Sequence, residues 1–247
     1  MLKALFAAAA FVVAASQSAR GTIVFKQVVE LNGTGLGAVN TILTVQSPGS
    51  SSNESGCVAF GGVKGSPACF GTGNTGGDEK TGASQTQTRT IAESGATSAA
   101  AFVIVFNAAE PGNTSSSIIL DSLSVRFYNT TGTELYTASL AAPVEFSGTF
   151  PGIGNAGFAF VLDTLQAAQA QAAGAFNNPA NVIGLSAGLS DADGGPETFF
   201  VGARSAVGVP FDVDPEPIPE PSTYLTLGAG LLMLGFSRRR LVPHREL

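Results

Sequence analysis

The stretch AAAFVIVFN, residues 99–107, decides the fold of this chain. The stretch is apolar from Ala99 to Phe106, and a continuous apolar run of strand length indicates a strand buried on both faces. A second stretch, SIILDSLSVRFYN at residues 117–129, alternates in its second half. Leu123, Val125 and Phe127 fall on one side, and Ser122, Ser124 and Arg126 fall on the other. This alternation predicts a strand with one buried face.

Other segments rich in β-branched and aromatic residues are expected to be strands. They are TIVFKQVVEL (22–31), AVNTILTVQ (38–46), the polar QTQTRTIAES (85–94), ELYTASL (134–140), GFAFVL (157–162), NVIGLSAGLS (181–190) and ETFFVGAR (197–204). The polar segment is expected at an edge or on an exposed face, and residues 47–84 are expected to form a long connection. Asp163 is expected to cap one short helix that Gly174 ends.

This pattern of about eight or nine strands and one helix favours an antiparallel β-sandwich, jelly-roll or immunoglobulin-like, over a βαβ fold. The chain is 44% hydrophobic with 31 glycines, which fits strands joined by turns and excludes a disordered chain. The net charge is −6, and the basic residues of the body are scattered singly. Nucleic acid is therefore excluded as a partner.

The first residues, MLKALFAAAAFVVAASQSARG, have the order of a secretory signal peptide. Lys3 precedes an apolar run at residues 5–15, and small residues follow. The run is too short to span a bilayer. Residues 1–19 are therefore expected to direct export through the Sec machinery, with cleavage after Ala15, Ser16, Ser18 or Ala19.

Export favours a disulfide between Cys57 and Cys69, the two cysteines of the chain. They lie in GCVAFGGVKGSPACFG, without the C-x-x-C spacing or the histidine partners that a redox or metal pair needs. Closing so short a loop contributes roughly 3 kcal/mol at most.

The C-terminal region changes character after the last expected strand, so the β-sandwich domain is placed at residues 22–210. Residues 211–222, FDVDPEPIPEPS, form an acidic, proline-rich linker that is expected to be extended and stiff. Residues 223–240 begin with the apolar run TYLTLGAGLLMLGF and end on Arg238, Arg239 and Arg240. Tyr224 at one end and the arginines at the other favour a short transmembrane helix with its C-terminus in the cytoplasm.

The order Pro219, Glu220, Pro221, Ser222, then a short apolar segment, then an arginine cluster resembles the PEP-CTERM protein-sorting signal. The resemblance covers residues 219–240. It implies a bacterial envelope protein that an exosortase, an integral-membrane enzyme, cuts near the PEP box and passes to the cell surface or an exopolysaccharide matrix. An earlier triplet at residues 215–217 and a tail of LVPHREL after the arginines depart from the usual signal. An uncut membrane anchor is the alternative.

The sequence of the body contains few candidate catalytic or metal-binding residues. The one histidine, His244, lies beyond the arginines, which removes histidine-based catalysis from the exported body. In DADGGPE, the carboxylates of Asp191, Asp193 and Glu197 resemble part of a calcium loop. The full pattern of such a loop is absent, so an Asp-rich turn between two strands is the favoured explanation and a Ca²⁺ site is the alternative.

We therefore expect a structural or adhesive surface protein that is not an enzyme and needs no cofactor. The alternatives are a glycan- or calcium-dependent binding module and, more weakly, a hydrolase that uses carboxylates. The expected partners are the Sec machinery, an exosortase, the membrane as a transient tether, and exopolysaccharide.

Overall fold

The apolar run at residues 102–106 lies in the middle of a sheet. In the computed structural model it belongs to β6 (Phe102–Asn107), which pairs with β10 (Gly157–Leu162) on one side and with β12 (Glu197–Ala203) on the other. All six residues of β6 are buried, as a strand between two neighbours requires. The prediction of a strand here is confirmed, while residues 99–101, which the same prediction included, form the 3-10 turn η2 (Ala99–Ala101).

The structure describes residues 22–29, 39–47, 51–60, 63–64, 77–80, 85–109, 117–147 and 157–211. The chain divides into two compact units, residues 1–211 and residues 212–247, and the described elements all belong to the first.

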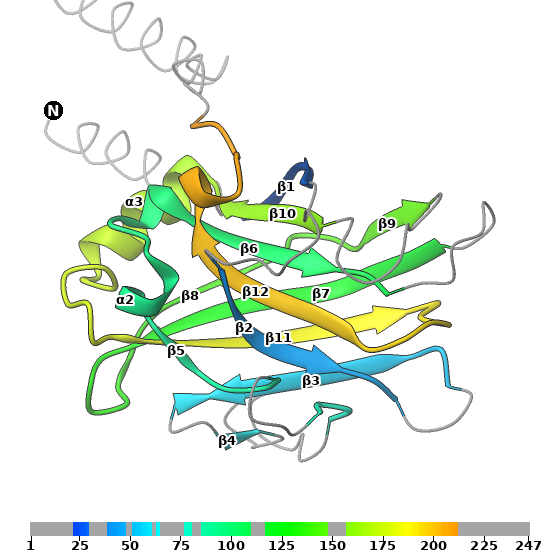
Figure 1. Ribbon diagram of the computed structural model, residues 1–247. Coiled ribbons are helices and arrows are strands. Elements are labelled where there is room, and N and C mark those ends of the chain that lie inside the picture. The colour runs from blue at the N-terminus through cyan, green and yellow to red at the C-terminus, as the bar shows by residue number, and fades with distance from the viewer. Residues whose placement is uncertain are drawn as a thin grey trace, which may run out of the picture. The chain divides into compact units, whose positions relative to one another are not determined.

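The described strands form two antiparallel sheets (Figure 1). The first has five strands in the order β1-β10-β6-β12-β2, with β1 at Ile23–Val29 and β2 at Val39–Val45. The second follows the order β4-β3-β11-β7-β8, with β5 also paired to β11 and β9 also paired to β7. The bounds of its strands are Glu54–Ala59 (β3), Val63–Lys64 (β4), Arg89–Thr90 (β5), Ser117–Tyr128 (β7), Glu134–Ser139 (β8), Val144–Ser147 (β9) and Val182–Ser190 (β11).

One hydrophobic cluster draws on both sheets and fills the space between them. Phe102 of the first sheet meets Phe127 of the second edge to face, with ring centroids 5.4 Å apart. Phe158 of the first stacks on Phe146 of the second at 3.9 Å. Most phenylalanines of the described residues therefore belong to the core, as expected from the sequence. The antiparallel, β-rich prediction is confirmed.

The alternation in β7 also appears as predicted. Leu123, Val125 and Phe127 are buried in the shared core, whereas Ser124 and Arg126 are only half-buried on the other face. The return strand β8 pairs with β7 as a hairpin, joining Val125 to Ala138. Strand β9, which pairs with the first part of β7, was not predicted.

The prediction of a polar strand over residues 85–94 is wrong for most of the segment, including residues 85–88. Only Arg89 and Thr90 are strand, and Ile91–Ser94 form the short helix α2. The reason is a capping box, in which Glu93 N–H donates to the Thr90 hydroxyl and Thr90 N–H donates to the Glu93 carboxylate. The residues T-x-x-E carried this signal in the sequence.

The prediction that residues 47–84 form only a connection is also wrong, because they contain β3 and β4. Strand β3, ESGCVA, has few large apolar residues and was therefore missed. Gly56 at its centre explains the composition, since a Cβ atom there would lie 2.5 Å from the Val45 side chain.

The single helix expected after the strand at 157–162 is confirmed as α3 (Thr164–Ala172). Asp163 caps it by accepting a hydrogen bond from the Gln166 N–H at 2.7 Å. Gly174 follows the helix with a φ of +81°, a conformation that favours glycine.

Candidate functional site

Asp191 and Asp193, two of the carboxylates that resemble part of a calcium loop, lie in the turn between β11 and β12, and Glu197 is the first residue of β12. Asp191 and Asp193 are exposed, whereas Glu197 is fully buried at the start of β12. Asp191 has a φ of +57°, which is common for aspartate in a turn. Within the described ranges no three His, Cys, Asp or Glu side chains gather into a group that holds a metal. The structure therefore does not bring Asp191, Asp193 and Glu197 together as a ligand set, and the turn accounts for the two aspartates.

The outer face of the seven-stranded sheet carries hydroxyl groups side by side. Ser186, Ser124 and Ser139 are register neighbours across β11, β7 and β8, and the Ser124 and Ser139 hydroxyl oxygens lie 2.7 Å apart. Neighbouring strands are about 4.8 Å apart, so the hydroxyls form a regular row. Such a row offers hydrogen bonds to a polar ligand.

One end of this face carries an aromatic and charged group of side chains. Tyr128 lies 6.1 Å from Phe60, measured between ring centroids, and Arg126 pairs with Glu134 at 3.9 Å. Burial raises the pKa of Tyr128, and the nearby Glu134 charge raises it further, although Arg126 opposes both effects. The Tyr128 hydroxyl therefore stays protonated at neutral pH and is able to donate a hydrogen bond.

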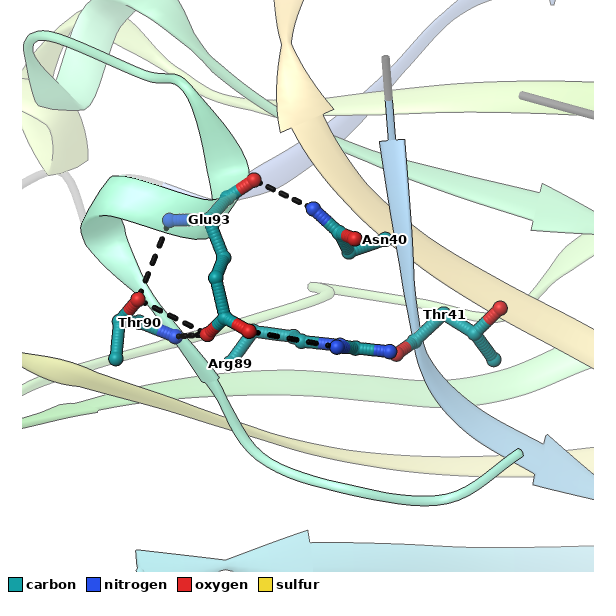
Figure 2. A network of polar contacts seen from close by, with 5 residues as sticks. All are labelled: Asn40, Thr41, Arg89, Thr90 and Glu93. Atoms are coloured by element: carbon teal, nitrogen blue, oxygen red, sulfur yellow. Dashed lines mark hydrogen bonds and ion pairs between the residues drawn. The ribbon is translucent and has the colours of Figure 1, made fainter. Parts of the chain in front are cut away.

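The segment β5–α2 is fastened to the edge of the five-stranded sheet by a polar network (Figure 2). The Arg89 Nε donates to the Thr41 carbonyl at 2.6 Å, and the Asn40 amide donates to the Glu93 carbonyl at 2.5 Å. Burial raises the pKa of Glu93, but hydrogen bonds from Thr90 and the charge of Arg89 outweigh it and hold the pKa below its ordinary value. Every polar partner in this network is another part of the chain, so its role is to hold β5 and α2 against β2.

The body ends in a clasp built on Arg204, which lies in the 3-10 turn η3 (Arg204–Ala206) directly after β12. Its side chain is 6% exposed, and its guanidinium donates to the carbonyls of Ala100, at 3.4 Å, and Pro210. The same guanidinium lies 4.8 Å from the centre of the Phe211 ring, within cation–π range. The clasp thus holds the last two described residues, Pro210 and Phe211, to the rest of the body.

Apolar packing supports this clasp. Val209 is buried against the outer face of the five-stranded sheet, in a cluster with Val29, Val103, Val105, Ala159 and Val161. Its N–H donates to the Arg204 carbonyl at 3.0 Å. The chain therefore remains packed on the sheet up to this point.

The remaining predicted sites lie partly or wholly outside the described residues. These are the signal peptide at 1–19, Cys69, Pro219, Glu220, Pro221 and Ser222 of the PEP box, the apolar run at 223–236, Arg238, Arg239 and Arg240, and His244. Cys57 is described and is fully buried in β3, and its bond to Cys69 stays a prediction. In the ranges that the structure covers, no helix is both long and apolar enough to span a bilayer.

The described part of the chain defines an antiparallel two-sheet β protein whose body is clasped up to Phe211. Comparison with protein families then matches residues 217–240 to the PEP-CTERM protein-sorting motif. The chain therefore carries a PEP-CTERM sorting motif, as the resemblance over residues 219–240 led us to expect. Searches of curated proteins and of solved structures gave no match.

The clasp was not predicted from the sequence. Arg204 looked like one of several scattered basic residues, and nothing in its neighbours marks a buried guanidinium. The one signal was its position, at the end of the last strand and seven residues before Phe211.

Proposed function

We propose that this chain is an exported bacterial protein that an exosortase processes near Pro219, Glu220 and Pro221 and releases to the cell surface or an exopolysaccharide matrix. The match of residues 217–240 to the PEP-CTERM motif carries this proposal. The predicted signal peptide at residues 1–19 supports it, because an exosortase substrate must first be exported. The acidic linker at residues 211–222 supports it further, since its proline-rich sequence is expected to be extended and so to leave the PEP box accessible to an enzyme.

The test is release of the protein from its own host cells. Glu220→Ala with Pro221→Ala is expected to leave the full-length form in the membrane fraction. The matched control replaces Pro215 and Glu216 with Ala in the first triplet, which lies outside the matched motif. Retention by the first pair and normal release of the control support processing at the second triplet. Normal release of both variants contradicts it.

We further propose that the body is a jelly-roll sandwich with a structural or adhesive role and no catalytic reaction. Taking β2, β3, β6, β7, β8, β10, β11 and β12 as strands one to eight, the sheet orders read 1-8-3-6 and 2-7-4-5. This is the order that two Greek keys produce in a jelly roll, an architecture found in capsid and lectin domains. It supports the jelly-roll alternative over the immunoglobulin-like one.

A second candidate function is glycan binding by the outer face of the seven-stranded sheet. The hydroxyl row of Ser186, Ser124 and Ser139 supports it. The test is binding of the full-length chain to a glycan array, with Ser124→Val as the variant and Ser117→Val, elsewhere on β7, as the control. Glycan binding that only Ser124→Val weakens supports this candidate, and absence of binding to any glycan contradicts it.

A further inference from the structure

After β12 the chain turns back onto the body. The N–H groups of Val207 and Val209 both donate to the Arg204 carbonyl, at 3.3 and 3.0 Å. Gly208 between them has a φ of +68°, a conformation that favours glycine, and its carbonyl accepts from the Gln27 side chain of β1 at 3.4 Å. The turn places Val209 on the outer face of the five-stranded sheet, where its side chain is 3% exposed.

Arg204 then ties the end of this turn to a distant part of the body. Its guanidinium donates to the Ala100 carbonyl at 3.4 Å and to the Pro210 carbonyl, and it lies against the Phe211 ring. The Arg204 residue is 6% exposed, and hydrogen bonds from a charged group are strong where water is excluded. The folded body therefore includes Phe211, and chain that can extend away from it begins no earlier than residue 212.

Few residues separate this end of the body from the sorting motif. The matched motif begins at residue 217, so the five residues 212–216 lie between it and Phe211. An extended proline-rich chain rises by about 3.1 Å per residue, so residues 212–219 reach at most about 25 Å from Phe211. The clasp withholds residues 205–211, which would add at most about 23 Å if they were extended.

This reach matters because the proposed cleavage takes place at the membrane. The apolar segment that is expected to enter the membrane begins at residue 223, directly after the PEP box at residues 219–221. The headgroup layer of a bilayer is about 5–8 Å thick on each side. An enzyme that cuts a chain must also enclose several residues beside the bond, and a folded body cannot enter that space. A reach of about 25 Å leaves room for the enzyme, whereas a reach of about 10 Å leaves almost none.

We propose that Arg204 is a positioning residue for sorting, because its clasp at Phe211 sets how far the PEP box can extend from the body toward the exosortase. This inference rests on the proposed function and adds the body-side limit of the spacer to it. The clasp and the spacer act in series. A chain whose spacer is too short is therefore expected to regain its reach when the clasp opens.

The experiment measures the fraction of the protein that host cells release, starting from the full-length chain. Deleting residues 212–216 keeps the matched motif but shortens the reach to about 9 Å, and is expected to lower the released fraction at least about tenfold. The control replaces the same residues with Ser-Pro-Ser-Pro-Ser. It keeps the length and the stiffness of the spacer and is expected to be released like the wild type.

The diagnostic variant adds Arg204→Met and Val209→Ser to the deletion. These changes remove the guanidinium donors and the apolar anchor, so residues 205–211 can extend and the reach returns to about 30 Å. Release is expected to rise at least about fivefold above that of the deletion alone. The matched control adds Phe146→Leu to the deletion instead, which weakens the core away from the clasp and is expected to restore nothing. A purely structural role for Arg204 predicts equal release from these two variants.

The proposal is overturned if the deletion is released like the wild type, if the Ser-Pro control is retained like the deletion, or if the diagnostic variant is released no better than the Phe146→Leu control. If the diagnostic variant does not fold, Arg204→Met alone is added to the deletion and must exceed the same control. Retention of Glu220→Ala with Pro221→Ala, together with normal release of the deletion, rejects this inference alone. Normal release of both rejects the proposed processing itself.

Discussion

The contact between Phe146 and Phe158 provides a direct test of how the two sheets pack. Phe146 belongs to β9 of the seven-stranded sheet and Phe158 to β10 of the five-stranded sheet, and their rings stack with centroids 3.9 Å apart. Replacing either ring by leucine is expected to lower the free energy of unfolding by about 1–2 kcal/mol, less than the 3–5 kcal/mol of truncation to alanine. Aromatic pairs in contact are coupled by about 0.5–1.5 kcal/mol beyond their separate burial.

The assay is a double-mutant cycle of urea unfolding on Phe146→Leu, Phe158→Leu and the double variant. A coupling of about 0.5–1.5 kcal/mol is expected for this pair. The control cycle combines Phe146→Leu with Phe176→Leu, because Phe176 packs on Phe102 and Phe127 instead. If the coupling of Phe146 to Phe158 is no larger than that of the control pair, the packing of the two sheets described above is refuted.

Three further predictions concern the periphery of the body. Arg204→Met removes the donors to the Ala100 and Pro210 carbonyls while keeping the aliphatic packing. This variant is expected to lower the free energy of unfolding by about 1–3 kcal/mol and to speed hydrogen exchange at the Val209 amide. Unchanged exchange at that amide would argue against the clasp. Because the pKa of Glu93 is held below 4.5, its contribution to stability is present above that pH and is lost as the pH falls through the lowered pKa. Glu93→Gln is therefore expected to flatten the pH dependence of unfolding in this acidic range, and a slope equal to that of the wild type would contradict the assignment. In oxidising buffer, Cys57→Ser is expected to lower the free energy of unfolding by roughly 3 kcal/mol at most. A reductant is expected to lower the stability of the wild type but not that of this variant. If a reductant destabilises the variant as well, the bond to Cys69 is not its target.

Most of the strands and the helix α3 could be predicted from strong local patterns in the sequence. The apolar run of β6 and the alternation of β7 predicted both strands because burial on one or two faces leaves a direct mark on the sequence. Asp163 likewise marked the start of α3, since a side-chain cap must stand directly before the helix.

The missed elements depend on contacts distant in sequence. Strand β3 owes its place to Gly56, which lets Val45 of another sheet approach closely, and no local pattern reveals that neighbour. Around Asp191 the local spacing of carboxylates resembled a calcium loop, but among the described residues no group of side chains that could hold a metal is found there.

The proposed processing removes the C-terminal sorting segment, and the intact mass of the mature protein from its native host shows whether this removal takes place. We expect a mass that lacks the signal peptide and also lacks the apolar segment and arginines of residues 223–240. A mature protein whose mass still includes residues 223–240 would contradict it.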